Sequence, residues 1–149
     1  NGSTVYSTKP VVNCTIVSNT VPPAYAACVG NFVNCIIADN GPYDVWGRSE
    51  LETTLTNCIY GTVKGTTVSN IYGSVHIGST AAIKFESTDI ADANAYVPQY
   101  PSPARDAGRD CGLTAADRDL AGRKRVKGMG IDIGCYECIG SGGLILHVR

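Results

Sequence analysis

An Asn–Cys pair recurs three times in the first half of the chain, as Asn13–Cys14, Asn34–Cys35 and Asn57–Cys58. The second pair follows the first after 21 residues, and the third follows the second after 23. A period in the low twenties is the length of one coil of a β-solenoid. The sequence therefore predicts an all-β chain folded as a right-handed parallel β-helix. We expect about three to four coils and an irregular C-terminal capping segment.

Apolar and polar residues alternate around each of these pairs. The pattern is clear in two segments and weaker in the third: Val12, Cys14 and Ile16; Val33, Cys35 and Ile37; Thr56, Cys58 and Tyr60. A period of two places one set inside the coil and the other outside. Neighbouring coils then stack the cysteines in a column, about 4.8 Å apart. Such a column is either a metal or redox site or a ladder of buried thiols. We favour the ladder, because the coil repeat alone explains the spacing. The asparagines form a second column, either an outward ladder or a ladder at a turn.

The length of 149 residues favours a single domain. Charged residues make up only 17% of the chain and glycine is frequent, which favours strands and turns over long helices. We expect β-helix coils over residues 1–86, a C-terminal cap of the same domain over residues 87–138, and a Gly-rich hinge with an apolar terminal strand over residues 139–149. A last strand is predicted over residues 82–85 and a short helix over residues 114–120.

The charge of the chain argues against two classes of partner. The formal net charge is −1, with −3 on residues 1–103 and +2 on residues 104–149. Neither value indicates binding to nucleic acid or to an anionic membrane. No apolar run reaches the roughly 18 residues needed to cross a bilayer, so we expect no membrane span. Asn1 is expected to be a processed end or the cut end of a longer protein, because it follows neither an initiator methionine nor a signal-like stretch.

The seven cysteines are an odd number, so at least one stays unpaired unless chains are cross-linked. In a secreted protein the expected disulfide joins Cys111 to Cys135 or to Cys138. The spacing of Cys135 and Cys138 is also that of a redox or zinc half-site. A second such pair is missing, however, and the chain has only two histidines, so we expect no metal at these thiols.

Two segments of the C-terminal third resemble a known family. The first is residues 102–108, Ser-Pro-Ala-Arg-Asp-Ala-Gly. The second joins residues 119–126, Asp-Leu-Ala-Gly-Arg-Lys-Arg-Val, to residues 131–137, Ile-Asp-Ile-Gly-Cys-Tyr-Glu. They are similar to the "SPAIDAG" and "DLDGNPRV…VDIGAYE" segments of secreted bacterial right-handed parallel β-helix proteins, the choice-of-anchor or polymorphic-outer-membrane-like repeat family. With the Asn–Cys coils, which are typical of that family, the resemblance covers residues 11–138.

The resemblance implies that the chain is the carboxy-terminal part of such a protein and that its ending closes the solenoid. Four positions depart from the family pattern, where an acidic residue, asparagine, proline and alanine are replaced by Ala121, Arg123, Lys124 and Cys135. An acidic loop of this kind can bind calcium through several oxygens. Asp117 and Asp119 still form a D-x-D pair, so calcium at these two residues is the one cofactor candidate. The alternative role of Asp117 is to cap the predicted helix with Thr114 as its N-cap.

The sequence predicts no enzyme. Polysaccharide hydrolases need paired carboxylates on one face of the solenoid. The coils carry few charges, and Asp44 with Glu50 or Glu52 is the one candidate pair. Nothing on a neighbouring coil completes a site. Phosphate loops, nucleophile elbows and zinc motifs are also missing from the sequence.

Aromatic residues give the solenoid a second candidate role. Five of them are expected on its surface, where they could stack on sugar rings: Tyr25, Tyr43, Trp46, Tyr60 and Tyr72. Packing at turns is the alternative, because tyrosine and tryptophan tolerate half-burial.

The chain closes with a Gly/Ser-rich hinge and four apolar residues, Leu144, Ile145, Leu146 and Val148. Such a strand either folds back on its own chain or adds to another chain by strand augmentation. We therefore expect a non-catalytic structural or adhesive module of a secreted or cell-surface protein, joined head to tail into a homo-oligomer or fibre through this strand. The alternatives are a carbohydrate-binding module and the C-terminal fragment of a polysaccharide lyase or hydrolase.

Overall fold

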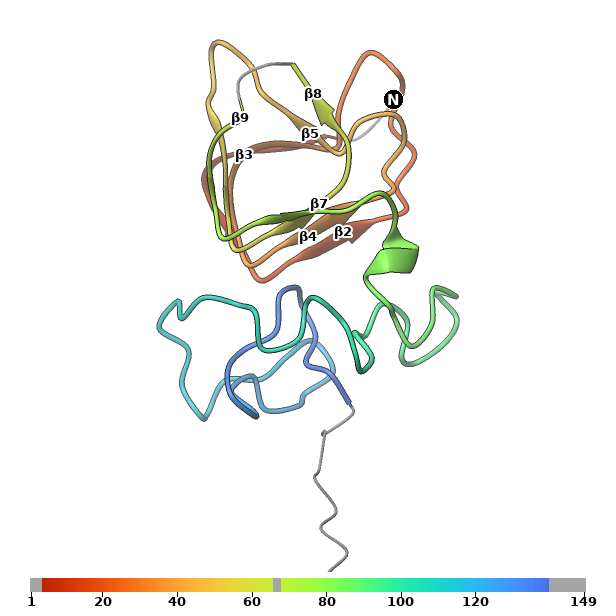
Figure 1. Cartoon of the computed structure of the whole chain (residues 1–149), viewed down its shortest axis with the longest axis vertical. Coiled ribbons are helices and arrows are strands. Elements are labelled where there is room, and N and C mark those ends of the chain that lie inside the picture. The colour runs from red at the N-terminus through yellow and green to blue at the C-terminus, as the bar shows by residue number, and fades with distance from the viewer. Residues whose placement is uncertain (1–3, 66–67, 140–149) are drawn as a thin grey trace, which may run out of the picture.

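The computed structural model describes residues 4–65 and 68–139 (Figure 1). The predicted terminal strand, with Leu144, Ile145, Leu146 and Val148, lies outside the described residues. The described chain is all-β, as predicted, and its strands pair in parallel in two sheets. The first sheet contains β1 (Val5–Val12), β3 (Cys28–Val33), β5 (Val45–Trp46), β6 (Thr53–Thr56), β8 (Val63–Lys64) and β9 (Val68–Tyr72). The second contains β2 (Thr15–Val17), β4 (Ile36–Ala38), β7 (Ile59–Tyr60) and β10 (Val75–His76).

The chain passes alternately through the two sheets, and the strands of each pass pair with those of the next pass. We call these four passes repeats: β1 and β2, β3 and β4, β5 to β7, and β8 to β10. In the first sheet β3 pairs with β1 and with β6, and β6 pairs with β9. In the second sheet Thr15 lies opposite Ile36, and Ile36 lies opposite Ile59. The Asn–Cys segments are therefore neighbours in space, as their spacing predicts.

Each asparagine of the repeated pair forms the corner between the two sheets. The backbone of Asn13, Asn34 and Asn57 is left-handed, with φ of 54°, 52° and 49°. Asparagine tolerates this conformation better than most residues do. In the fourth repeat the corner is Gly73, with φ of 60°, which explains why the Asn–Cys mark ends there. The asparagine column is thus a ladder at a turn, and Asn34 Nδ2 donates to Asn13 Oδ1 over 3.1 Å.

Two apolar clusters lie on opposite faces of the second sheet. The inner cluster lies between the sheets and includes Phe32, Leu55 and the stacked thiols of Cys35 and Cys58. The outer cluster joins Ile36, Ala38 and Ile59 to residues that follow the last strand, which are Ile77, Ile83, Phe85, Ala104 and Ile133. Side chains of alternate parity therefore enter different clusters, and both faces of this sheet are buried at its central strands, β4 and β7.

Residues 87–138, which we call the covering segment, lie along the outer side of the second sheet (Figure 1). Their contacts reach three repeats. Asn57 Nδ2 donates to Ala107 O over 3.4 Å, Asn34 Nδ2 donates to Arg109 O over 2.7 Å, and Asn13 Nδ2 lies 3.5 Å from Cys111 Sγ. This segment was predicted to close the solenoid at its end. It lies instead along the outer face of the second sheet, where it contacts three repeats.

Two predicted elements are wrong. No helix forms over residues 114–120, where Thr114 and Asp117 close a single turn instead. Arg118 Nη1 donates to the carbonyl oxygens of Ala115, Ala116 and Asp117, which a longer helix would use itself. No strand forms over residues 82–85 either. A 3₁₀ helix, η1 (Thr80–Ala82), comes first, and Lys84 then has a φ of 59°, which is incompatible with an extended strand.

Candidate functional site

The predicted calcium loop is occupied by the chain's own hydrogen bonds. Asp117 is exposed, and its Oδ2 accepts from the N–H and hydroxyl of Thr114 over 2.6 and 2.8 Å, which fits the capping role. The Asp119 carboxylate is fully buried and accepts from the N–H groups of Ala121, Arg123 and Glu137 over 2.7–3.0 Å. Within the described part of the chain, no group of three or more His, Cys, Asp or Glu residues is arranged to hold a metal ion.

A second set of buried charges lies beside Asp119, and apart from the family-like ending no sequence pattern indicates a function for it. Arg125, Asp132 and Glu137 are only 3%, 2% and 2% exposed. Arg125 Nη1 lies 3.3 Å from Glu137 Oε1, and Nη2 donates to the carbonyl oxygens of Asp132 and Gly134. The Asp132 carboxylate accepts from the N–H groups of Asp106 and Cys138. These side chains take the place of regular secondary structure, because they satisfy backbone groups of an irregular segment.

Burial also changes the protonation of these acids. It raises the pKa of Glu137 to about 7, with the nearby Asp132 carboxylate adding to the effect and Arg125 opposing it. Burial likewise raises the pKa of Asp132 above its ordinary value. The ionisation of Glu137 therefore falls near neutral pH, where the cluster can change its charge.

The candidate catalytic pair of the coils is not brought together as a site. Asp44 is buried, and its carboxylate accepts four hydrogen bonds, two from Asn40 and two from Thr62, over 2.8–3.1 Å. Asn40 in turn accepts from Asn19 of the preceding repeat. Asp44 thus ties three repeats together at a corner. Glu50 is exposed and lies 3.5 Å from Arg48.

The cysteines behave as the ladder predicts. Cys35 N donates to Cys58 Sγ over 3.4 Å, and Cys35 Sγ lies 3.3 Å from Val11 O. The hydrogen bond with Cys35 and burial both raise the pKa of Cys14, and burial raises that of Cys28. Cys14 and Cys28 are thus held protonated, which makes them poor nucleophiles and poor metal ligands, whereas the hydrogen bond with Cys35 lowers the pKa of Cys58.

The three cysteines proposed for a disulfide lie in or beside the covering segment. Cys111 is exposed beside Asn13, the backbone N–H of Cys135 donates to Thr15 Oγ1 over 3.1 Å, and Cys138 is buried beside Asp132. No disulfide joins any of the seven cysteines, all of which are within the described residues. The bridge from Cys111 stays a prediction.

The aromatic residues do not share one face. Tyr60 is buried, whereas Tyr25 and Tyr72 are 51% and 63% exposed. Tyr43 and Trp46 form a half-buried cluster with two cations. Lys64 Nζ lies 4.3 Å from the centre of the Trp46 ring and 5.4 Å from that of Tyr43, and Arg48 Cζ lies 4.9 Å from the Trp46 ring. We call Tyr43, Trp46, Arg48 and Lys64 the aromatic–cation cluster.

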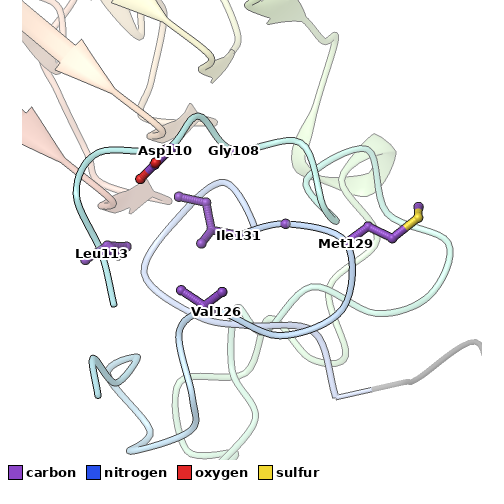
Figure 2. Close-up of a pocket in the computed structure, with 7 residues that line it drawn as sticks. Gly108, Asp110, Leu113, Val126, Met129 and Ile131 are labelled. Carbon is purple, nitrogen blue, oxygen red and sulfur yellow. The ribbon is translucent and has the colours of Figure 1, made fainter. Parts of the chain in front are cut away.

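A cavity of about 320 Å³ opens in the covering segment (Figure 2). Its walls come from residues 108–113 and 126–131 and are largely apolar: Gly108, Asp110, Leu113, Val126, Met129, Gly130 and Ile131. In Figure 2 the side chain of Ile131 lies between the segment that carries Gly108 and Asp110 and the side chain of Val126. No sequence pattern predicts this cavity, because both of its walls are irregular in structure.

Comparison with known proteins gives no identification: no family, no curated protein and no solved structure matches this chain. Among the described residues, no helix is long and apolar enough to cross a membrane.

Proposed function

We propose that this chain is a non-catalytic structural or adhesive module of a secreted or cell-surface protein, built as a right-handed parallel β-helix. The observation that carries the proposal is the corner ladder. Asn13, Asn34 and Asn57 make the same left-handed corner between the same two parallel sheets in three successive repeats. A corner that recurs in this way supports a β-helix of stacked coils, an architecture that serves as a rigid stalk or a binding surface.

The use made of the buried carboxylates supports a structural role. Asp44, Asp119 and Asp132 each accept two or more hydrogen bonds from the chain's own groups, mostly from backbone N–H. A catalytic acid or base needs a lone pair or proton directed at a substrate. Here the lone pairs of the buried acids accept hydrogen bonds from the chain itself.

Exposed strand edges support the idea that modules join end to end. β1 pairs only with β3 among the described strands, and Val5, Tyr6 and Val12 are 37%, 58% and 36% exposed. At the other end of the stack Val75 of β10 is 45% exposed. Unpaired parallel edges of this kind are templates for another strand, and a head-to-tail contact that does not close produces a fibre.

Light scattering combined with electron microscopy tests the assembly, using the intact chain and a chain without residues 140–149. We expect the intact chain to form elongated polymers through the exposed edges of β1 and β10, and the shortened chain tests whether the terminal strand is needed for this link. Compact monomers of both chains at high concentration would contradict end-to-end assembly. Release of reducing or unsaturated sugar ends from a panel of polysaccharides would contradict the non-catalytic role.

The aromatic–cation cluster favours carbohydrate binding as a second candidate function. It combines aromatic rings, which stack on sugars, with cations that can bond to hydroxyl or carboxylate groups. Trp46 is the only tryptophan, so its fluorescence reports on this site alone. Neutral and acidic oligosaccharides are expected to change the emission of the intact chain, and the change should weaken in a Lys64→Gln variant. An emission that no sugar alters would remove this candidate.

A further inference from the structure

We infer that the cavity of the covering segment is the binding site for the apolar terminal segment of the same chain, residues 144–148. This inference goes beyond the proposed function and does not rest on it. Four of the residues that line the cavity have apolar side chains: Leu113, Val126, Met129 and Ile131. Two of these remain open to solvent, since Val126 is 43% and Met129 is 93% exposed. Exposed apolar surface gathered in a cavity is typical of a site that binds a ligand or another segment.

The last residues that the structure describes lie close to this cavity. The backbone N–H of Cys138 donates to Asp132 Oδ2 over 2.5 Å, and Asp132 directly follows the cavity residue Ile131. Five residues separate Cys138 from Leu144, with the order Ile-Gly-Ser-Gly-Gly. An extended chain spans about 3.3–3.6 Å per residue, so this five-residue linker reaches up to about 18 Å from Cys138.

The chemistry of the two partners is complementary. The segment offers leucine, isoleucine and valine side chains to apolar walls, and it also carries His147 and Arg149. Asp110, an exposed acidic residue, lies at the cavity and can pair with these basic side chains. A short Gly-rich linker gives a segment an effective concentration in the millimolar range at a site it can reach. Reach therefore favours the chain's own segment over that of a second copy.

Methyl NMR on the full chain tests this directly. Isoleucine labelled with 13C at its δ1 methyl reports on the wall, and an Ile131→Val variant identifies the Ile131 signal. We expect removal of residues 144–149 to shift the Ile131 signal and to leave that of Ile90, which is 87% exposed and outside the cavity, unchanged. A Leu144→Ser, Leu146→Ser double variant should give the same shift as the deletion, and Ser141→Ala in the linker should give none.

A substitution in the wall provides the second arm. Val126→Asp places a charge in the cavity, so deleting residues 144–149 from that variant should no longer shift the Ile131 signal. The matched control is Leu120→Asp, at a residue that is 74% exposed and does not line the cavity, where the deletion should still act. An Ile131 signal that the deletion leaves unchanged would overturn the inference. A shift that depends on protein concentration would also overturn it, since it would assign the cavity to the segment of a second copy.

Discussion

At the scale of single residues, asparagine at the corners explains why this chain shows its repeat so clearly. Each corner needs a left-handed backbone, and a side chain that bonds across repeats stabilises it. Asn34 does both, since it contacts Asn13 in the repeat below and the backbone of Arg109 in the covering segment. The period of the pair was visible in the sequence because one backbone requirement recurs. The partner in the covering segment was not visible, because it lies 75 residues away.

Replacing Asn34 separates these two roles. Asn34→Ala loses the bonds to Arg109 and places alanine in a left-handed corner, so we expect it to lower the free energy of unfolding by about 3 kcal/mol. Asn34→Gly keeps the corner and loses only the bonds, so it should be less destabilised than alanine by about 1 kcal/mol. Urea denaturation followed by Trp46 fluorescence measures both. Equal stabilities of the two variants would show that the corner conformation costs nothing.

The buried acids of the covering segment are the residues that sequence reasoning located but did not interpret. Asp132 and Glu137 stand in the family-like ending, yet their partners are backbone groups of an irregular chain and the guanidinium of Arg125. No periodicity signals such partners. In contrast, the short spacing of Thr114 and Asp117 did reveal a local cap, because both partners belong to one turn.

Glu137 predicts how stability depends on pH. Its pKa in the folded protein is about 7, above the ordinary value of 4.5, so the folded state binds the proton more tightly than the unfolded state does. The free energy of unfolding is therefore expected to fall as the pH rises from 4.5 to 7, by up to about 3 kcal/mol. Asp132 acts in the same direction, because its pKa is also raised.

The measurement is denaturation at a series of pH values between 4 and 8. A Glu137→Gln variant should show a flatter dependence, because its side chain does not ionise. Asp117→Asn is the matched control: the bonds from Thr114 lower the pKa of that exposed carboxyl, so its loss should not flatten the slope in this range. A wild-type stability that rises with pH over the same range would show that Glu137 is ionised in the fold.

At the scale of elements, strands were predictable where they repeat and unpredictable where they do not. The register of β2, β4 and β7 follows from the Asn–Cys period. The turn at residues 114–117 and the chain around Lys84 depend on single side chains and single backbone angles, which override local propensity. β1 shows a further device. It carries Lys9 and Pro10, and its pairing with β3 shifts register between Ser7 and Val11.

These features weaken pairing of β1 with a further strand, because proline has no N–H to donate and lysine carries a charge, so an end-to-end contact through β1 is weaker than its exposed edge alone would allow. Lys9→Thr combined with Pro10→Val should therefore increase self-association of the chain. Light scattering over a range of concentrations measures the effect, with Lys84→Asn, outside any strand and compatible with the left-handed backbone there, as the control for lost charge. Unchanged association in the double variant would show that β1 is not a contact between chains.

At the scale of the whole molecule, the second sheet makes one folding unit of the repeats and the covering segment. Its inner face packs on the inner cluster, and its outer face packs on Ile83, Ala104 and Ile133. Neither face can lose its cover without exposing buried apolar surface. The repeats and the covering segment are thus expected to unfold together, although they look like separate regions in the sequence.

Ile133 tests this coupling. It is 1% exposed, so Ile133→Ala should lower the free energy of unfolding by about 2–5 kcal/mol. The effect should appear equally in Trp46 fluorescence, which reports on the repeats, and in far-ultraviolet circular dichroism, which reports on the whole chain. Ile90→Ala, at an exposed position, should change neither. A Trp46 transition that Ile133→Ala leaves in place would show two independent units.

The contacts of residues 107–111 have a consequence for how such a chain can grow. Ala107, Arg109 and Cys111 lie beside Asn57, Asn34 and Asn13 in turn, so every second residue of this stretch meets one repeat further back along the stack. The length of this stretch therefore matches three repeats, with two residues of the stretch for each repeat. Duplicating one repeat would leave a corner asparagine with no contacting residue in this stretch. A duplicated repeat could then be added only before Asn13, or together with two further residues in the stretch 107–111.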